Sequence, residues 1–541
     1  MTYRTSRTTC STVTSSGWSS RPSPATSLLR VAAERAGYDA ILALADLKTS
    51  HSAFPEDELY GYRRRWRDDG DDDYGYGDSA GGKGDRKYEI QDLIDSEVRL
   101  THWTGPDGRG LEETSLSVSD SEVCASTENG DLTPYSLEYE GYMGNWGNTL
   151  DRWYHRAAVV VWPRAQAFAN RAETSPGWAL DEITAMAAAG DVAGARAAVA
   201  SLARFWDGAV RGLIAAAAGT EPAAGFLGKA LGTADAVADA PTATSLLRPF
   251  RVESLTKEHA GPLATVAADY GQDWTADLLR TWFGDGKQPW QYGVGLERSR
   301  WVADRLPGLC QVLRATGGDA EATAQHLLDL SWAWLGSEID AALALSSPSF
   351  RDRQLDELGK PLAAVLTSVS TLGAASLGDT VSGHIRKQGG AVTVLELSAL
   401  RAAGTSPEGA LPGGTGFADL AADCAARLRD RLALAQRAIG DWSIELPAAG
   451  CTCELCVTLG TFLADPRRRT FEWPLAEQRR RHIHGRIDQA ELPVTHVTRR
   501  LGRPFTLVLT KTDAVFTGEH SAREAAKTDL EWLTDRWNVP G

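Results

Sequence analysis

Three cysteines lie close together near the C-terminal end of the chain, at Cys451, Cys453 and Cys456. Thiolates at this spacing can converge on one Zn²⁺ ion, which takes four nitrogen or sulfur ligands in a closed structural site. The sequence therefore predicts a structural zinc site that needs a fourth ligand from another part of the chain. The alternative is that these residues are reduced thiols in a hydrophobic core, because free cysteine is among the most buried residue types.

The same part of the chain holds its most basic stretch, in which Arg467–Arg469 and Arg479–Arg481 lie near Phe471 and Trp473. Single-stranded nucleic acid stacks on aromatic rings that are interleaved with basic residues. The whole chain, however, has 56 basic and 71 acidic residues and a net charge of −15, which disfavours general binding to a phosphate backbone. We therefore expect these arginines to be paired or solvated, and we do not expect nucleic acid as a partner.

Motifs of other enzyme classes are missing or out of context. The chain has neither a Gly-x-x-x-x-Gly-Lys-Ser/Thr phosphate loop nor a His-Glu-x-x-His zinc-protease motif. One Gly-x-Ser-x-Gly match occurs at 77–81, but a nucleophile elbow needs a buried strand before the serine and a helix after it. The acidic and glycine-rich surroundings instead predict a solvated acidic loop at 68–86.

The elements that must position these residues are mostly helices. Between 166 and 440, apolar residues recur at steps of three and four, as in helices with one buried face, and we expect stacked helical hairpins of the α-solenoid kind. A helix and then a short strand at 39–45 are predicted near the start, and further strands at 157–163 and 505–509. The expected fold class is mainly α, with a helical-hairpin array flanked by small α/β segments.

The chain has 541 residues, which is more than one hydrophobic core usually organises. We predict a disordered or non-native N-terminus at 1–26, an α/β segment at 27–165, a helical repeat-like region at 166–440 and a cysteine-containing α/β module at 441–541. The abrupt change of composition near Ser27 is typical of a truncated gene or a shifted reading frame.

The composition also bears on where the protein works. No apolar run approaches the roughly 20 residues that span a bilayer, and the first residues lack a signal-peptide pattern. Seven cysteines, an odd number, fit reduced thiols or a metal site better than a disulfide framework. We therefore expect a cytoplasmic protein without a membrane partner.

Two strings of residues carry a family resemblance. The first includes Tyr142, Gly144, Asn145, Gly147, Trp153, Tyr154, His155, Arg156, Ala157, Ala158, Trp162 and Pro163; the second includes Cys451, Cys453, Cys456, Phe462, Leu463, Asp465, Pro466, His482, Gly502, Pro504, Phe505, Thr506, Leu507, Val508, Thr510 and Lys511. Together they resemble the region that follows the catalytic domain in large bacterial, fungal and plant proteins with a prolyl-4-hydroxylase-type 2-oxoglutarate/Fe(II) dioxygenase domain. The resemblance spans about 30–541, and Trp146 departs from it, because the family more often has an acidic residue there.

The resemblance implies a ligand and an activity. His482 is the position that matches a histidine of the family, so it is the expected fourth ligand of Zn²⁺ beside Cys451, Cys453 and Cys456. His484 and Cys424 remain alternatives for this fourth position. The intact family protein would use Fe(II), O₂ and 2-oxoglutarate to hydroxylate a substrate.

The iron-binding residues of that family are not found in this sequence. A non-haem Fe(II) oxygenase holds its metal with two imidazoles and one carboxylate, and in this superfamily the first histidine and the carboxylate come as His-x-Asp. None of the ten histidines is followed two residues later by Asp or Glu. The family's second signature is a histidine followed later in the chain by a basic residue that pairs with the 2-oxoglutarate carboxylate. His155 and Arg164 only imitate it, and we expect a structural role for them. No catalytic residue, and no ligand of Fe(II) or 2-oxoglutarate, is assigned.

Three functions follow as hypotheses. The first is a non-catalytic accessory scaffold of such a dioxygenase, whose helical array presents a surface to a protein partner or protein substrate. A second possibility is that a separately encoded oxygenase domain completes an enzyme with this chain. The third is a stand-alone protein- or nucleic-acid-binding module built around the cysteines.

Overall fold

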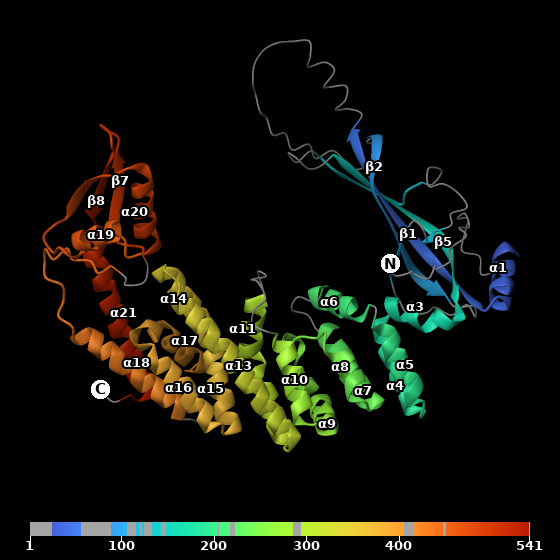
Figure 1. Ribbon diagram of the computed structural model, residues 1–541. Helices are drawn as coiled ribbons and strands as arrows, with labels where there is room; N and C mark the ends of the chain where they lie inside the picture. The colour runs from blue at the N-terminus through green and yellow to red at the C-terminus, as the bar shows by residue number, and fades with distance from the viewer. Residues whose placement is uncertain are drawn as a thin grey trace, which may run out of the picture. The chain divides into compact units, whose positions relative to one another are not determined.

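The computed structural model describes residues 24–55, 88–104, 115–119, 122–123, 133–141, 148–203, 205–216, 222–284, 294–404, 415–446 and 451–539. Most of these residues are helical (Figure 1), so the expectation of a mainly α protein is confirmed. The chain forms two compact units, Met1–Gly212 and Leu213–Gly541. The N-terminal residues 1–23, the acidic loop at 68–86 and the Gly-x-Ser-x-Gly match at 77–81 lie outside the described residues.

The first unit contains a five-stranded antiparallel sheet, which is larger than the predicted small α/β segment. Its strands are β1 (Tyr38–Pro55), β2 (Tyr88–Thr104), β3 (Leu116–Val118), β4 (Ser136–Glu140) and β5 (Thr149–Pro163), in the order β3-β2-β1-β5-β4. The prediction of a short strand at 39–45 was wrong in length, since β1 has 18 residues. The alternation of buried and more exposed positions continues beyond Ala45 through Leu47 and Thr49, although polar residues occupy much of this part.

The two faces of this sheet are covered differently. One face carries a hydrophobic core made by Ala43, Ala45, Leu47, Val98, Leu100, Trp103, Leu116, Tyr154, Ala158, Val160 and Trp162. On the other face, α1 (Pro24–Arg35) places Ala33 against Ala40 and Val159. α1 begins at Pro24, within the segment 1–26 that the sequence predicts to be disordered or non-native.

Short helices follow β5, and the last of them crosses the boundary between the two units at Gly212. They are the 3-10 helix η3 (Arg164–Gln166), then α3 (Ala167–Thr174), α4 (Pro176–Ala188), α5 (Val192–Leu202) and α6 (Trp206–Ala216). α3, α4 and α5 pack against one another. Gly190 and Asp191 separate α4 from α5, and the Asp191 carboxylate caps α5 by accepting the Gly194 N–H at 2.8 Å.

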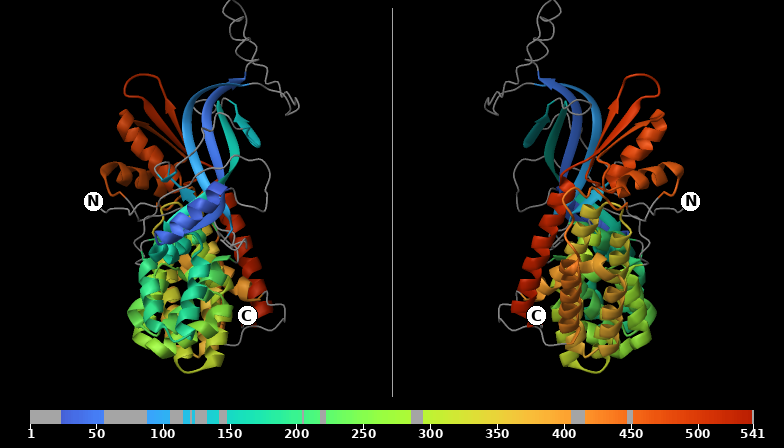
Figure 2. Two further views of the ribbon diagram at one scale, coloured as in Figure 1. Left: turned by 90° about the vertical axis from the view of Figure 1, so that its right-hand side faces the viewer. Right: turned by 90° about the vertical axis from the view of Figure 1, so that its left-hand side faces the viewer.

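The second unit begins with a long run of helices (Figures 1 and 2). They are α7 (Pro222–Val237), α8 (Ala240–Leu247), η4 (Val252–Ser254), η5 (Lys257–His259), α9 (Ala260–Tyr270), α10 (Gln272–Phe283), α11 (Val294–Asp304), α12 (Leu306–Thr316), α13 (Asp319–Leu343), α14 (Pro348–Glu357), α15 (Gly359–Leu372), α16 (Ala375–Lys387), η6 (Gly389–Val392), α17 (Thr393–Gly404) and α18 (Thr415–Ala433). The longest of them, α13, packs against α9, α10, α12 and α15. No helix among the described residues is long and apolar enough to cross a membrane.

The last part of the second unit is a small α/β module. It consists of α19 (Glu454–Ala464), β6 (Thr470–Pro474), α20 (Glu477–Gln489), β7 (Val494–Arg499), β8 (Thr506–Lys511) and α21 (Ala514–Trp537), with antiparallel strand order β6-β8-β7. The strand predicted at 505–509 is β8, and Leu507 and Leu509 are fully buried as expected of its inner face. α19 and α20 contribute Leu459, Phe462 and Ile483 to the core beneath the sheet, and α21 also packs against α18.

Candidate metal centre

The three cysteines lie at the beginning of α19. Cys453 is the N-cap residue of this helix, Cys456 lies in its first turn, and Cys451 precedes the helix. Apolar residues farther along α19, among them Leu459 and Phe462, are buried in the core of the module. Because these residues fix the helix against the sheet, the position of its N-terminus is fixed as well.

His482 brings the fourth ligand from α20, which packs against α19. Its Nε2 atom lies 3.4 Å from the Cys453 sulfur and 3.2 Å from the Cys456 sulfur. One ligand atom from each of the three cysteines and His482 lies within 4.8 Å of all the others. In the described part of the chain, this is the one group of three or more His, Cys, Asp or Glu residues arranged to hold a metal ion.

The distances can be compared with those around a tetrahedral zinc ion. With Zn–S near 2.3 Å and Zn–N near 2.1 Å, a sulfur and a nitrogen ligand lie about 3.6 Å apart. The two sulfur–nitrogen distances observed here are shorter by only a few tenths of an ångström. Small side-chain rotations would therefore suffice to bring His482 and these two cysteines to the spacing of such a tetrahedron.

The two cysteines nearest His482 have opposite pKa shifts. The backbone N–H of Cys456 and the side chain of Cys451 lower the pKa of Cys453 to about 6, as expected of a thiol at the N-terminus of a helix. Burial and the neighbouring Cys453 raise the pKa of Cys456 to about 11. One thiolate is thus available near neutral pH, and a bound cation would favour the ionised form of the other thiols.

Neither alternative fourth ligand belongs to this group. His484 Nδ1 is hydrogen-bonded to His496 Nδ1, and the His496 Nε2 lies 2.9 Å from an oxygen of Asp488. Cys424 is fully buried in α18, where burial and then Glu396 raise its pKa to about 12. Of the three candidates, the structure places only His482 with the cysteines.

The arginines near the cysteines have partners within the module. Arg480 is buried, donates to the Leu475 carbonyl and lies over the Phe505 ring. Arg469 lies 4.3 Å from the Trp442 ring and 3.3 Å from an oxygen of Asp513, and Arg481 lies 3.4 Å from Glu477. Much of the basic stretch is therefore engaged in contacts within the protein.

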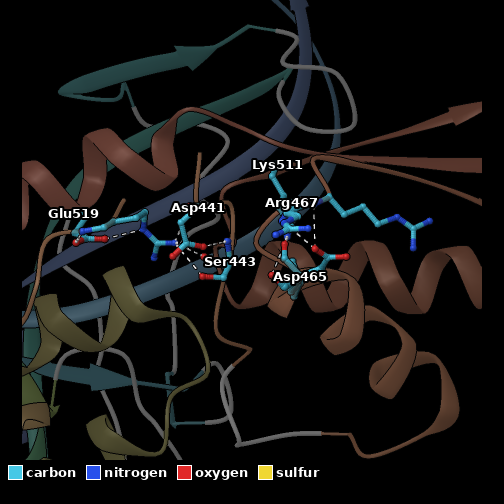
Figure 3. Close-up of polar contacts among 9 residues, drawn as sticks. Asp441, Ser443, Asp465, Arg467, Lys511 and Glu519 are labelled. Atoms are coloured by element: carbon cyan, nitrogen blue, oxygen red, sulfur yellow. Dashed lines mark hydrogen bonds and ion pairs between the residues drawn. The ribbon is translucent and has the colours of Figure 1, made fainter. Parts of the chain in front are cut away.

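Sequence reasoning assigned no structural role to Lys511, which the structure buries completely. Its Nζ donates to the carbonyls of Leu463 at 2.8 Å and Asp465 at 2.7 Å, at the C-terminal end of α19. Figure 3 shows Lys511 beside Asp465, whose side chain accepts the Arg467 N–H at 2.9 Å. The alternation of side chains along β8 could have predicted this burial, since Lys511 shares a strand face with Leu507 and Leu509.

His155 and Arg164, which imitate a family signature, have separate partners. His155 stacks on Tyr135 at 3.8 Å between ring centroids, and its Nε2 lies 3.7 Å from an oxygen of Asp46. Arg164 donates to Asp39 at 3.0 Å. Each side chain thus forms a structural contact with β1.

The chain was compared with known proteins at the level of family, sequence and structure. No family model, curated protein or solved structure matches it. The interpretation of the cluster therefore depends on its own residues and their geometry.

Proposed function

We propose that this chain is a non-catalytic accessory scaffold of a 2-oxoglutarate/Fe(II) dioxygenase-family protein, and that a structural Zn²⁺ ion stabilises its C-terminal module. The observation that carries the zinc part of the proposal is the convergence of Cys451, Cys453, Cys456 and His482. A catalytic zinc site keeps one position open for water or substrate, whereas a structural site is closed by four protein ligands. Four nitrogen and sulfur ligands match the closed type.

The dioxygenase relationship is supported by the two strings of residues that carry the resemblance. The non-catalytic assignment is supported by the sequence, in which no histidine is followed two residues later by Asp or Glu. The scaffold role is supported by the many helices that precede the metal cluster. Arranged as an α-solenoid, such helices would offer an extended surface to a protein partner or protein substrate.

The metal content tests the zinc part of this proposal. Native mass spectrometry of the full chain, purified without chelator, is expected to show one Zn²⁺ per chain. His482→Ala should reduce the bound zinc, because three ligands hold the ion less tightly than four. His520→Ala is the matched control, since His520 is exposed on α21 and should leave the metal content unchanged. A wild-type chain that carries no metal, or equal losses in the two variants, would contradict the zinc site.

Succinate release tests the scaffold part. With Fe(II), 2-oxoglutarate and O₂ supplied, we expect the full chain to release no more succinate than a protein-free control, because no iron ligands can be assigned in it. Release that depends on both Fe(II) and 2-oxoglutarate would contradict a non-catalytic role. It would favour the reading in which this chain supplies part of an oxygenase.

A further inference from the structure

The five-stranded sheet separates its charged residues by face. Residues that lie directly opposite each other in antiparallel strands point to the same side. One side carries Asp46, Lys48 and Asp151, and these are paired: Lys48 lies 2.6 Å from Asp151, and Tyr135 donates to Asp46 at 3.0 Å. We call this the paired face.

The other side, which we call the cationic face, has a different composition. It begins with the hydrophobic core of the sheet and continues along β1 and β5 to Thr49, His51 and Arg152, with Thr49 opposite Arg152. Arg156 lies on the same face, opposite Ala45. No Asp or Glu occurs on this face between residues 41 and 53 of β1 or among the described residues paired with them in β2 and β5.

The polar contacts of Arg152 leave its charge without a carboxylate partner in the described structure. Its Nη2 donates to His51 Nε2 at 2.9 Å, and its guanidinium lies 5.7 Å from the Tyr154 ring. Burial, and then the charge of Arg152, lower the pKa of His51, which keeps this imidazole neutral and able to accept the bond. The positive charge of Arg152 is therefore not cancelled by its neighbour.

Several buried polar atoms on this face have no hydrogen-bond partner in the described structure, and two of them belong to residues that lie directly opposite each other. These two are the Nε of Arg152 and the hydroxyl of Thr49, a residue that is only 6% exposed. A buried polar atom that makes no hydrogen bond costs about 1–3 kcal/mol. An oxyanion placed between the two side chains would accept from both of them and neutralise the guanidinium.

Two tyrosine rings meet over the cationic face. Tyr88 of β2 and Tyr139 of β4 lie 4.9 Å apart between ring centroids, although β1 and β5 separate their strands. Because strands at these positions are about 14 Å apart in a sheet, the two tyrosine side chains reach toward each other across β1 and β5. An apolar side chain is also available on this face, since Leu93 of β2 lies opposite His51 and is 57% exposed. The cationic residues thus lie in a partly enclosed and partly apolar setting.

We propose that the cationic face binds a small organic carboxylate through Arg152 and Thr49. The carboxylate would accept from the Arg152 Nε and the Thr49 hydroxyl, and the apolar part of the ligand would lie against Leu93. An organic acid fits this setting better than phosphate does, because phosphate has no apolar part to match these side chains. This site lies in the first unit and goes beyond the zinc-stabilised scaffold, so either proposal can fail without the other.

Calorimetric titration of the full chain tests the site. The probes are acetate, butyrate and phosphate at constant ionic strength, and we expect saturable binding of both carboxylates, with butyrate the tighter. Arg152→Gln should weaken butyrate at least about tenfold, which corresponds to about 1.4 kcal/mol. Arg99→Gln is the matched control, because it removes an equal charge from an exposed arginine that pairs with Glu97 at 2.6 Å. Its affinity for butyrate should equal that of the wild type.

A second variant keeps the test decisive if Arg152→Gln does not fold. Thr49→Val removes only the hydroxyl, and it should weaken butyrate binding while the far-ultraviolet circular dichroism stays unchanged. Three outcomes would overturn the site: no saturable carboxylate binding by the wild type, equal weakening in the Arg152 and Arg99 variants, or unchanged binding in Thr49→Val. Saturable binding of phosphate alone would overturn the assignment to a carboxylate.

Discussion

Glu396 of α17 is fully buried and contacts Arg427 of α18. Burial raises the pKa of Glu396 to about 7, against the opposing effects of the hydrogen bond and charge of Arg427. The unfolded chain gives this carboxyl its ordinary pKa of 4.5. Between these two values the folded state binds more protons than the unfolded state, so the contribution of Glu396 to stability falls as the pH rises.

Glu396→Gln should therefore remove part of the pH dependence of stability. In the wild type, we expect ionisation of Glu396 to lower the free energy of unfolding by about 2 kcal/mol between pH 5.5 and 8. The variant should lack this decrease, because glutamine does not titrate. Urea denaturation at the two pH values measures the difference, and Glu357→Gln is the control, since Glu357 is exposed on α14. Parallel pH dependences in Glu396→Gln and the wild type would contradict the raised pKa.

At the scale of elements, the contact between α15 and α17 depends on a residue without a side chain. A Cβ on Gly359 would lie 2.4 Å from the Cβ of Ser398 and 2.9 Å from the backbone nitrogen of Ala399. The clash with a backbone atom cannot be relieved by a side-chain rotation. A substitution at Gly359 must therefore move one helix away from the other.

We predict that Gly359→Ala lowers the free energy of unfolding by about 1–3 kcal/mol, as overpacking usually does. Gly383→Ala is the matched control, because Gly383 lies exposed on α16 with no atom within 4 Å of its added Cβ. Alanine favours a helix more than glycine does, so this control should stabilise the protein by up to about 1 kcal/mol. Denaturant unfolding of both variants compares their free energies of unfolding directly. If Gly359→Ala leaves this free energy unchanged, the two helices separate easily and the prediction is wrong.

Most elements of the fold could be anticipated, because periodicity is a local property. Steps of three and four residues predicted the helices around Val199, Leu263 and Leu327, and the alternation of Leu507 and Leu509 predicted β8. The length of β1 was missed because Lys48, Ser50 and His51 reduce its hydrophobicity without interrupting its alternation. Whether a central strand can contain polar side chains depends on their partners in the neighbouring strands, and the sequence of one strand does not reveal these partners.

The metal cluster and the Thr49–Arg152 pair were predictable to different degrees, because a sequence pattern reveals only residues that are close in the chain. Cys451, Cys453 and Cys456 are close in sequence, so their convergence could be expected, whereas His482 came from a resemblance and not from spacing. Thr49 and Arg152 are 103 positions apart, and only the register between β1 and β5 places them opposite each other. Contacts of this kind depend on strand pairing, which the sequence pattern did not determine.

At the scale of the whole molecule, the charge balance and the local contacts of the arginines act in the same direction. The net charge of −15 repels a polyanion at long range. At short range, Arg480 is buried, Arg469 contacts Trp442 and Asp513, and Arg468 lies 4.4 Å from the Phe471 ring. Neither the net charge of the chain nor the contacts of these arginines favours binding to a phosphate backbone.

We therefore predict no measurable affinity of the full chain for a single-stranded oligonucleotide at about 150 mM salt. Fluorescence anisotropy of a labelled oligonucleotide, repeated at low salt, checks this. Any binding that appears only at low salt should be equally weak after Arg479→Gln, since non-specific attraction does not depend on one exposed arginine. Binding that persists at about 150 mM salt and is lost in Arg479→Gln would mean that the basic stretch is a true nucleic-acid site, despite the acidic charge of the chain as a whole.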